Sequence, residues 1–111
     1  MKIENFIINE NASILDVIKK IQQNLNRAVL VMNRDEIVIG IISEGDILRS
    51  LILSKDIRGI CKNIMKKSFY FQKKKNIKEA RMIFKKKQIS IIPILDDELK
   101  LKEVITLEDI I

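Results

Sequence analysis

Two short motifs place a hydroxyl side chain three residues before an acidic side chain, each directly after an apolar run. They read Ser43-x-x-Asp46 and Thr106-x-x-Asp109. With this spacing the two side chains can form a capping box on the first turn of a helix. The free N–H groups of a helix N-terminus can also hold a phosphate, and a carboxylate can accept hydrogen bonds from two neighbouring sugar hydroxyls. The motifs therefore fit two interpretations, a structural cap or a binding site for a nucleoside phosphate.

The residues around the two motifs differ in a way that favours the first motif as a binding site. Gly40 precedes the first motif and Gly45 lies within it, where a residue without a side chain would let a ligand approach the backbone closely. Glu103 takes the place of Gly40 in the second motif. It adds a side chain and a negative charge near the expected anion, so we expect the second site to be weak or vacant.

Both motifs belong to an internal duplication with an offset of 63 residues. Apolar residues align with apolar, hydroxyl with hydroxyl and acidic with acidic, without a gap. The aligned segments include Val29-Leu30-Val31 with Ile92-Pro93-Ile94, Ile41-Ile42-Ser43 with Val104-Ile105-Thr106, and Asp46-Ile47 with Asp109-Ile110. The duplication predicts two similar structural units that place the two motifs in equivalent positions.

Each copy predicts a short strand, a helix, two strands joined by a polar turn, and a final helix. The helices follow from apolar residues at i, i+3, i+4 and i+7, and the paired strands from nearly continuous apolar runs. The predicted ranges are 6–8, 14–24, 28–32, 37–42 and 44–53 in the first copy, and 69–71, 77–87, 91–95 and 99–105 in the second, with a last helix after Thr106. We expect a first repeat over residues 1–55, a linker over 56–67 with one short helical turn, and a second repeat over 68–111.

The composition of the 111 residues excludes several kinds of site. The chain has no histidine, and its one cysteine, Cys61, permits neither an internal disulfide nor a multi-cysteine zinc site. No apolar run reaches the roughly 18 residues of a membrane span, and no signal peptide is evident. We therefore expect a cytoplasmic protein without a membrane association, and we find no catalytic constellation, so an enzyme is not predicted.

The net charge of +6 lies in the second half of the chain. Residues 1–55 carry seven basic and seven acidic residues, whereas residues 56–111 carry fourteen basic and eight acidic ones. The excess comes from the lysine runs 66–67, 73–75 and 85–87. Such runs are usually solvated surface, but they can also attract a nucleotide phosphate or a nucleic acid.

The duplicated β-α-β-β-α unit, with Gly-apolar-apolar-Ser/Thr-x-x-Asp after its last strand, resembles a pair of cystathionine β-synthase (CBS) domains. The resemblance covers residues 3–111 and extends to Ile92-Pro93-Ile94-Leu95-Asp96 and to Ile64-Met65. It implies an α+β fold in which two CBS repeats pack through their sheets with pseudo-two-fold symmetry. It also implies two clefts between the repeats.

In this family the clefts often bind AMP, ADP, ATP or S-adenosylmethionine as regulatory ligands, with no cofactor required. The resemblance implies that Ser43 and Thr106 touch phosphate or ribose and that Asp46 and Asp109 accept from the ribose hydroxyls. It implies that the residues at the start of the strand, including Ile91-Ile92-Pro93, line the part of the cleft that holds the adenine base. Many nucleotide-binding members have Arg or His just before the strand that contains proline, where this chain has Ser90 and Ile91. Arg27, the repeat partner of Ser90, is the only basic residue in either equivalent place. The implied ligand-binding residues are Gly40, Ser43, Asp46, Arg27, Ile92, Pro93, Thr106 and Asp109.

A narrower resemblance concerns the parent protein. Ser13-Ile14-Leu15-Asp16-Val17 and the segment Gly40–Arg49 are similar to the amino-terminal CBS pair of bacterial sugar-phosphate nucleotidyltransferases. The second copy has two residues after Asp109, where the first copy continues with about eight residues of apolar helix. We therefore expect a regulatory module cut from a longer protein, with an enzyme domain after Ile111.

Two other interpretations remain open. A ligand-free module would use apolar outer helix residues, such as Ile47, Leu48, Leu51 and Ile52, to form a homodimer or to dock a partner domain. A nucleic-acid-binding module would use the lysine runs together with Phe69-Tyr70-Phe71. The second is less favoured, because a strand would turn at least one of three consecutive aromatic residues inward.

Overall fold

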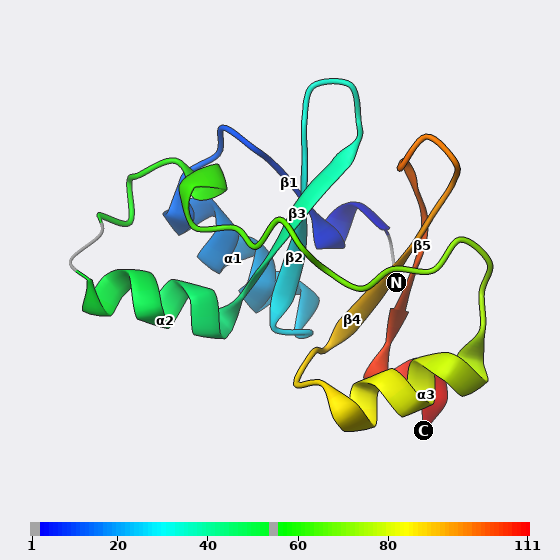
Figure 1. The fold of residues 1–111 in the computed structure, drawn as a ribbon. Helices are drawn as coiled ribbons and strands as arrows, with labels where there is room; N and C mark the ends of the chain where they lie inside the picture. The colour runs from blue at the N-terminus through cyan, green and yellow to red at the C-terminus, as the bar shows by residue number, and fades with distance from the viewer. Residues whose placement is uncertain (1–2, 54–55) are drawn as a thin grey trace.

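The first repeat carries most of the regular structure in the computed structural model, which describes residues 3–53 and 56–111 (Figure 1). After a 3-10 helix at Ile3–Phe6, its elements are β1 (Ile7–Asn9), α1 (Ile14–Asn24), β2 (Ala28–Met32), β3 (Val38–Ser43) and α2 (Glu44–Ile52). These bounds confirm the predicted helices and the hairpin. Ser54 and Lys55, in the predicted loop at the end of the first repeat, lie outside the described residues.

The second repeat follows a 3-10 turn at Cys61–Asn63, close to where one helical turn was predicted. It contains α3 (Ile77–Lys86), β4 (Ile91–Leu95), β5 (Leu101–Thr106) and a last 3-10 helix at Leu107–Ile110. The predicted strand over 69–71 is wrong, since only Gln72 pairs there, through an isolated parallel bridge to Ile94. Phe69 and Phe71 instead turn their rings into one cluster, with centroids 5.9 Å apart.

The two hairpins have the same strand register. In the first, Ala28 pairs with Ser43 and Met32 with Val38, with an irregularity between Val31 and Met32. Each pairing recurs 63 residues later in the second hairpin, including the irregularity before Leu95. The turns agree as well, because Glu36 and Leu99, also 63 residues apart, both have φ 64°. The duplication therefore extends to backbone detail and places Ser43 and Thr106 at equivalent strand ends.

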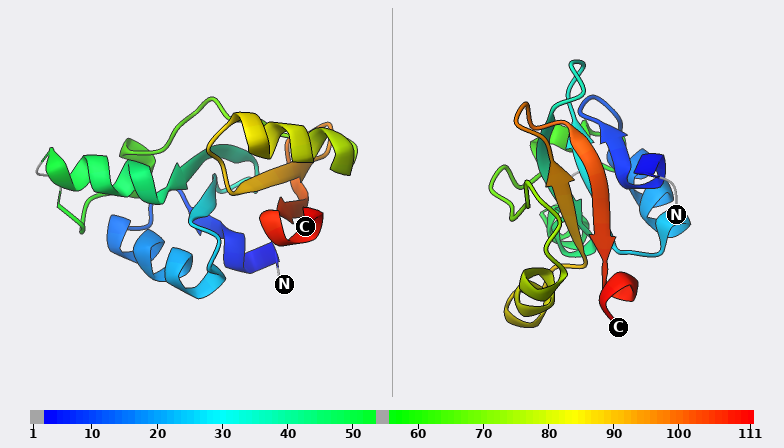
Figure 2. Two further views of the ribbon diagram at one scale, coloured as in Figure 1. Left: turned by 90° about the horizontal axis from the view of Figure 1, so that it is seen from below. Right: turned by 90° about the vertical axis from the view of Figure 1, so that its right-hand side faces the viewer.

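The core has three apolar clusters, and the middle one joins the repeats. One cluster lies between α1 and the first sheet, and another lies under α3 in the second repeat. The middle cluster combines Phe6, Leu30 and Val38 with Ile91 and Leu95. The predicted α+β class, with two repeats packed through their sheets, is confirmed. In Figure 2, α1 and α2 lie at one end of the molecule, α3 lies toward the other end, and the sheets lie between them.

The helices are short. The longest of them in the described part of the chain, α1, has 11 residues. None of the helices within residues 3–53 and 56–111 has the length and apolar character needed to cross a membrane.

Candidate functional site

A cavity of about 980 Å³ lies where the end of β3 meets the start of the second repeat. Its lining comes from both repeats and from the segment that joins them. The first repeat contributes the start of β2, the end of β3 and the first turns of α2, including Arg27, Ser43 and Asp46. Residues 66 and 68–70 form a second wall, and residues 87–91 form a third. A ligand here would therefore touch both repeats at once.

Ser43 and Asp46 form a complete capping box at the start of α2. The Asp46 carboxylate accepts from the Ser43 N–H at 2.9 Å and from the Ser43 hydroxyl at 3.0 Å. The Asp46 N–H in turn donates to Ser43 Oγ at 3.3 Å. The structural-cap interpretation is thus confirmed for this motif, and the same carboxylate stands on the wall of the cavity.

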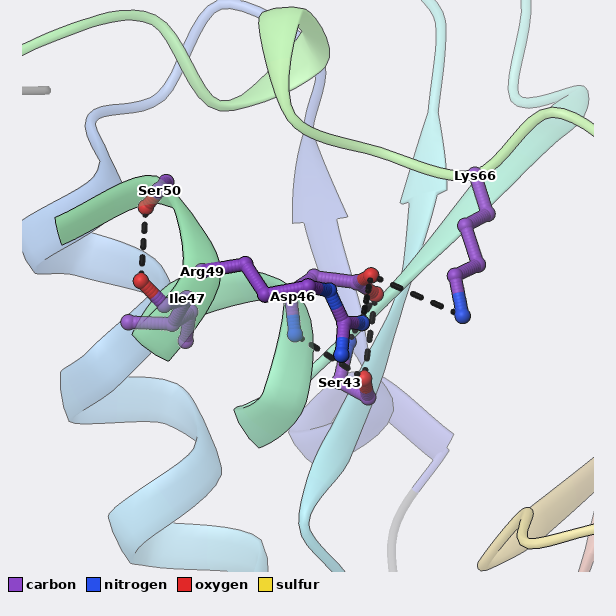
Figure 3. A network of polar contacts seen from close by, with 6 residues as sticks. All are labelled: Ser43, Asp46, Ile47, Arg49, Ser50 and Lys66. Carbon is purple, nitrogen blue, oxygen red and sulfur yellow. Dashed lines mark hydrogen bonds and ion pairs between the residues drawn. The ribbon is translucent and has the colours of Figure 1, made fainter. Parts of the chain in front are cut away.

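Two cations hold the other oxygen of Asp46 (Figure 3). Arg49 Nη2 donates to Asp46 Oδ1 at 2.8 Å, and Lys66 Nζ lies 3.7 Å from the same atom. The Asp46 side chain is 6% exposed, whereas those of Arg49 and Lys66 are 61% and 60% exposed. The carboxylate is fixed and buried, while the cationic groups can move in solvent.

The charge state of Asp46 follows from these contacts. Burial by itself raises the pKa of the carboxyl, but the backbone N–H of Ser43, the Arg49 guanidinium, the Ser43 hydroxyl and the Lys66 charge together outweigh it. The pKa of Asp46 is therefore held below its ordinary value of 3.8. The cavity wall carries a full negative charge at neutral pH, suited to accepting hydrogen bonds from hydroxyl groups.

Gly40, which lies in β3 three residues before Ser43, has a structural role. The segment joining the repeats crosses β3 here, with Ile41 and Lys66 exchanging backbone hydrogen bonds at 3.0 and 2.9 Å. A Cβ at Gly40 would lie 2.6 Å from Met65 Sδ and 2.9 Å from the Lys66 carbonyl oxygen. Glycine at this position lets the segment approach closely enough to bring Lys66 to Asp46.

The structure brings three of the eight predicted site residues together on the cavity wall, namely Arg27, Ser43 and Asp46. Gly40 faces the crossing segment, and the side chains of Ile92 and Pro93 are buried in β4. Thr106 and Asp109 form the second capping box, with the Thr106 N–H donating to Asp109 Oδ2 at 2.8 Å. These five are not among the residues that line this cavity.

The surroundings of the second motif differ from those of the first. Asp109 is exposed, and the Glu103 carboxylate forms an ion pair with Lys75 at 2.5 Å. That pairing raises the pKa of Lys75, through the hydrogen bond and the charge of Glu103. The side chain that replaces glycine is thus engaged in a surface ion pair.

Several lining residues did not emerge as site residues from the sequence. Arg49 stands three positions after Asp46, so a helical spacing already placed both on one face. Lys66, Lys87 and Phe69 were visible only as members of lysine runs or of an aromatic run. Nothing in the sequence shows that the chain between the repeats turns back to Asp46.

Two further features bear on function. An apolar groove of about 610 Å³ runs between α1 and α2, lined by Ile18, Leu48 and Leu51 among others. Cys61 is fully buried, and burial raises the pKa of its thiol to about 11, so the thiol is protonated at neutral pH. Across residues 3–53 and 56–111, no three acidic or cysteine side chains gather in a way that could hold a metal ion.

Comparison with known proteins identifies a family. The sequence profile of the CBS domain matches residues 1–53 and 61–111. No curated protein matches the chain.

Solved structures with the same fold include a CBS domain protein from Pyrobaculum aerophilum complexed with AMP. It is 20% identical, with a TM-score of 0.79 over 93% of this chain and 80% of that one. The CBS domain pair of the protein MJ0100, in complex with 5′-methylthioadenosine and S-adenosyl-L-methionine, is 21% identical, with a TM-score of 0.78 over 95% and 83%. A CBS domain pair/ACT domain protein from Thermotoga maritima is 21% identical, with a TM-score of 0.76 over 99% and 93%.

Proposed function

The chain belongs to the CBS domain family, and from this premise we propose that it is a regulatory, non-catalytic module that binds an adenosine nucleotide in the cavity beside Asp46. One observation carries the proposal: a buried, ionised carboxylate stands on the wall of a cavity lined by both repeats. The AMP bound by one structural relative and the adenosine derivatives bound by another support the ligand class.

The residues of the cavity divide into two chemical groups that suit a nucleotide. Asp46 would accept from the ribose hydroxyls, and Ser43 at the start of α2 would lie near the first phosphate. Phe69 and Ile89, which are partly exposed, would supply apolar surface for the base. A ligand held by both repeats would fix their relative packing, and an attached domain would respond to that change with a coupling free energy of about 1–3 kcal/mol.

Isothermal titration with AMP, ADP, ATP and S-adenosylmethionine tests this function. We expect at least one of them to bind with a stoichiometry of one, and Asp46→Ala to weaken that binding at least tenfold. Asp109→Ala is the matched control, because it removes the equivalent carboxylate away from the cavity. Binding that Asp46→Ala leaves at the wild-type affinity would contradict the assignment.

Homodimerisation is a second candidate function, favoured by the groove between α1 and α2. Leu48 and Ile52 on α2 are 61% and 80% exposed, and Leu25 at the end of α1 is 78% exposed. Ile47, predicted on the same outer face, is instead buried in the first core cluster. Light scattering should give the mass of a dimer for the wild type and of a monomer for Leu48→Glu; a monomeric wild type would contradict this role.

For the regulated partner, we propose a sugar-phosphate nucleotidyltransferase domain in the same protein. The support is the resemblance of Gly40–Arg49 to the corresponding segment of those enzymes. Fusing this chain to such a domain should make its activity respond to the ligand that binds beside Asp46, and Asp46→Ala should abolish the response. An unchanged rate at saturating ligand would contradict this partner.

A further inference from the structure

Resting on the proposed function, we infer that the cavity selects adenosine nucleotides with two or three phosphates. Uncharged or cationic adenosine derivatives, such as 5′-methylthioadenosine and S-adenosylmethionine, are expected to bind poorly. The selectivity follows from the charges around the cavity and from the way in which Asp46 is already paired.

The charged residues that line the cavity are mostly basic. Arg27, Arg49, Lys66 and Lys87 face two acidic residues, Glu44 and Asp46. Arg27 lies 3.7 Å from Glu44, and Arg49 and Lys66 share the single carboxylate of Asp46. The ionised lining therefore has a surplus of two positive charges, which attracts an anion and repels the sulfonium of S-adenosylmethionine.

Binding of a ribose at Asp46 would leave this net charge unchanged but would loosen the pairing of two of the cations. The ribose hydroxyls need the Asp46 oxygen that Arg49 and Lys66 now hold. When the sugar takes that oxygen, both cations lose part of their pairing, and their exposed side chains are free to turn toward the phosphates. A polyphosphate replaces the lost partner, whereas a ligand without phosphate leaves two cations crowded together.

The remaining two cations come from opposite repeats. Arg27 precedes β2 of the first repeat, and Lys87 caps the end of α3 in the second. The Ser90 hydroxyl donates to the Asn26 carbonyl between them, so the two segments are in direct contact. A chain of two or three phosphates between Arg27 and Lys87 would add an electrostatic link across the contact that joins the repeats.

Titration calorimetry at low ionic strength measures the selectivity. We expect ADP and ATP to bind more tightly than AMP, and at least tenfold more tightly than S-adenosylmethionine and 5′-methylthioadenosine, with the differences shrinking as salt is added. An AMP affinity equal to that of ATP would overturn the requirement for more than one phosphate. Adenosine and inorganic tripolyphosphate, tested separately, should each bind more weakly than ATP. Tripolyphosphate that binds as tightly as ATP would overturn the nucleotide requirement and assign the site to a simple anion.

A pair of neighbouring lysines supplies the matched variants. Lys87→Gln removes a charge that lines the cavity, and Lys86→Gln removes the same charge from the exposed end of α3 outside it. Lys87→Gln should weaken the binding of ATP about twofold to fivefold and leave the affinity for adenosine unchanged. Lys86→Gln should alter neither. An equal effect of both variants would overturn a specific contact at Lys87.

The outcomes separate this inference from the proposed function. If S-adenosylmethionine or 5′-methylthioadenosine binds beside Asp46 as tightly as ATP does, the charge selectivity fails while the regulatory site stands. If none of the adenosine ligands binds, both fail together.

Discussion

Asp46 and Asp109 occupy the same position in two copies of one motif, and their surroundings have become different. Both close a capping box on the hydroxyl residue three positions earlier. Asp46 is buried, paired with Arg49 and Lys66, and placed on a cavity wall. Asp109 is exposed at the surface. The comparison teaches that a backbone motif can be kept for its cap while the chemistry around it changes.

The difference can be followed at three equivalent positions. Lys66 corresponds to Ile3, Arg27 to Ser90 and Gly40 to Glu103. Each change lowers the positive charge or raises the negative charge near the second motif, although the strand registers are the same. The proposed selectivity for an anion would therefore depend on side chains from outside the motif, which can be tested by changing one copy at a time.

The largest difference between the two copies should appear in the free energy of unfolding when alanine is placed at position 40 or at the equivalent position 103. A Cβ at residue 40 would lie 2.9 Å from the Lys66 carbonyl oxygen, a backbone atom held in a two-bond bridge. Gly40→Ala should therefore lower the free energy of unfolding by about 1–3 kcal/mol. Urea unfolding measures it, with Glu103→Ala as the control, expected to stay within about 0.5 kcal/mol. Equal losses would show that the crossing segment does not distinguish the copies.

Removing the two capping carboxylates should give a smaller contrast. Asp46→Ala loses the hydrogen bonds from Ser43 and the charge-assisted bond from Arg49. We expect it to lower the free energy of unfolding by about 1–2 kcal/mol, and Asp109→Ala by less than about 1 kcal/mol, since the latter caps an exposed four-residue helix. Thermal unfolding of both variants without ligand checks this. A larger loss for Asp109→Ala would reverse the ranking of the two sites.

The charge of Asp46 should also appear in the pH dependence of stability. Its pKa is lowered in the folded state, so its contribution is complete above the ordinary value of 3.8 and is lost as the pH falls through the folded-state pKa. The gap in stability between wild type and Asp46→Asn should therefore stay constant from about pH 7 to about pH 5 and narrow as the pH falls further to about pH 3. Asp56 and Asp96, whose pKa values are also lowered, titrate in both proteins and cancel in the difference. A gap that stays constant over the whole range would mean that the charge of Asp46 adds no stability.

The sequence predicted the elements of this fold well because local patterns determine them. The ranges of α1, β2 and β4 agree with the structure, since each follows from periodicity or from a continuous apolar run. The strand over 69–71 failed because the backbone of this segment pairs with a neighbouring strand only at Gln72, so no ladder of hydrogen bonds forms. Local sequence patterns were sufficient to predict the helices and strands that form within one repeat.

The candidate site was predictable only in its motif. Ser43 and Asp46 are close in sequence, and their capping geometry follows from a three-residue spacing. Lys66 reaches Asp46 because the chain between the repeats pairs with Ile41, a contact between segments 25 residues apart. Lys87 reaches the cavity through the packing of the second repeat on the first. No local pattern encodes such approaches, so the group of cations around the cavity became visible only in the folded chain.

The smallest expected effect comes from placing glycine at the first position of the second motif, as in the first motif. Glu103→Gly removes the negative charge and the ion pair with Lys75, so the second motif then matches the first at every position of its pattern. If the motif alone determined binding, this variant would take up a second nucleotide. We expect calorimetry to give one ATP per chain for both wild type and variant, because Ile3 and Ser90 still stand where the first site has Lys66 and Arg27. A stoichiometry of two would show that Glu103 alone closes the second site, and the selectivity would then belong to the motif rather than to the cations that surround it.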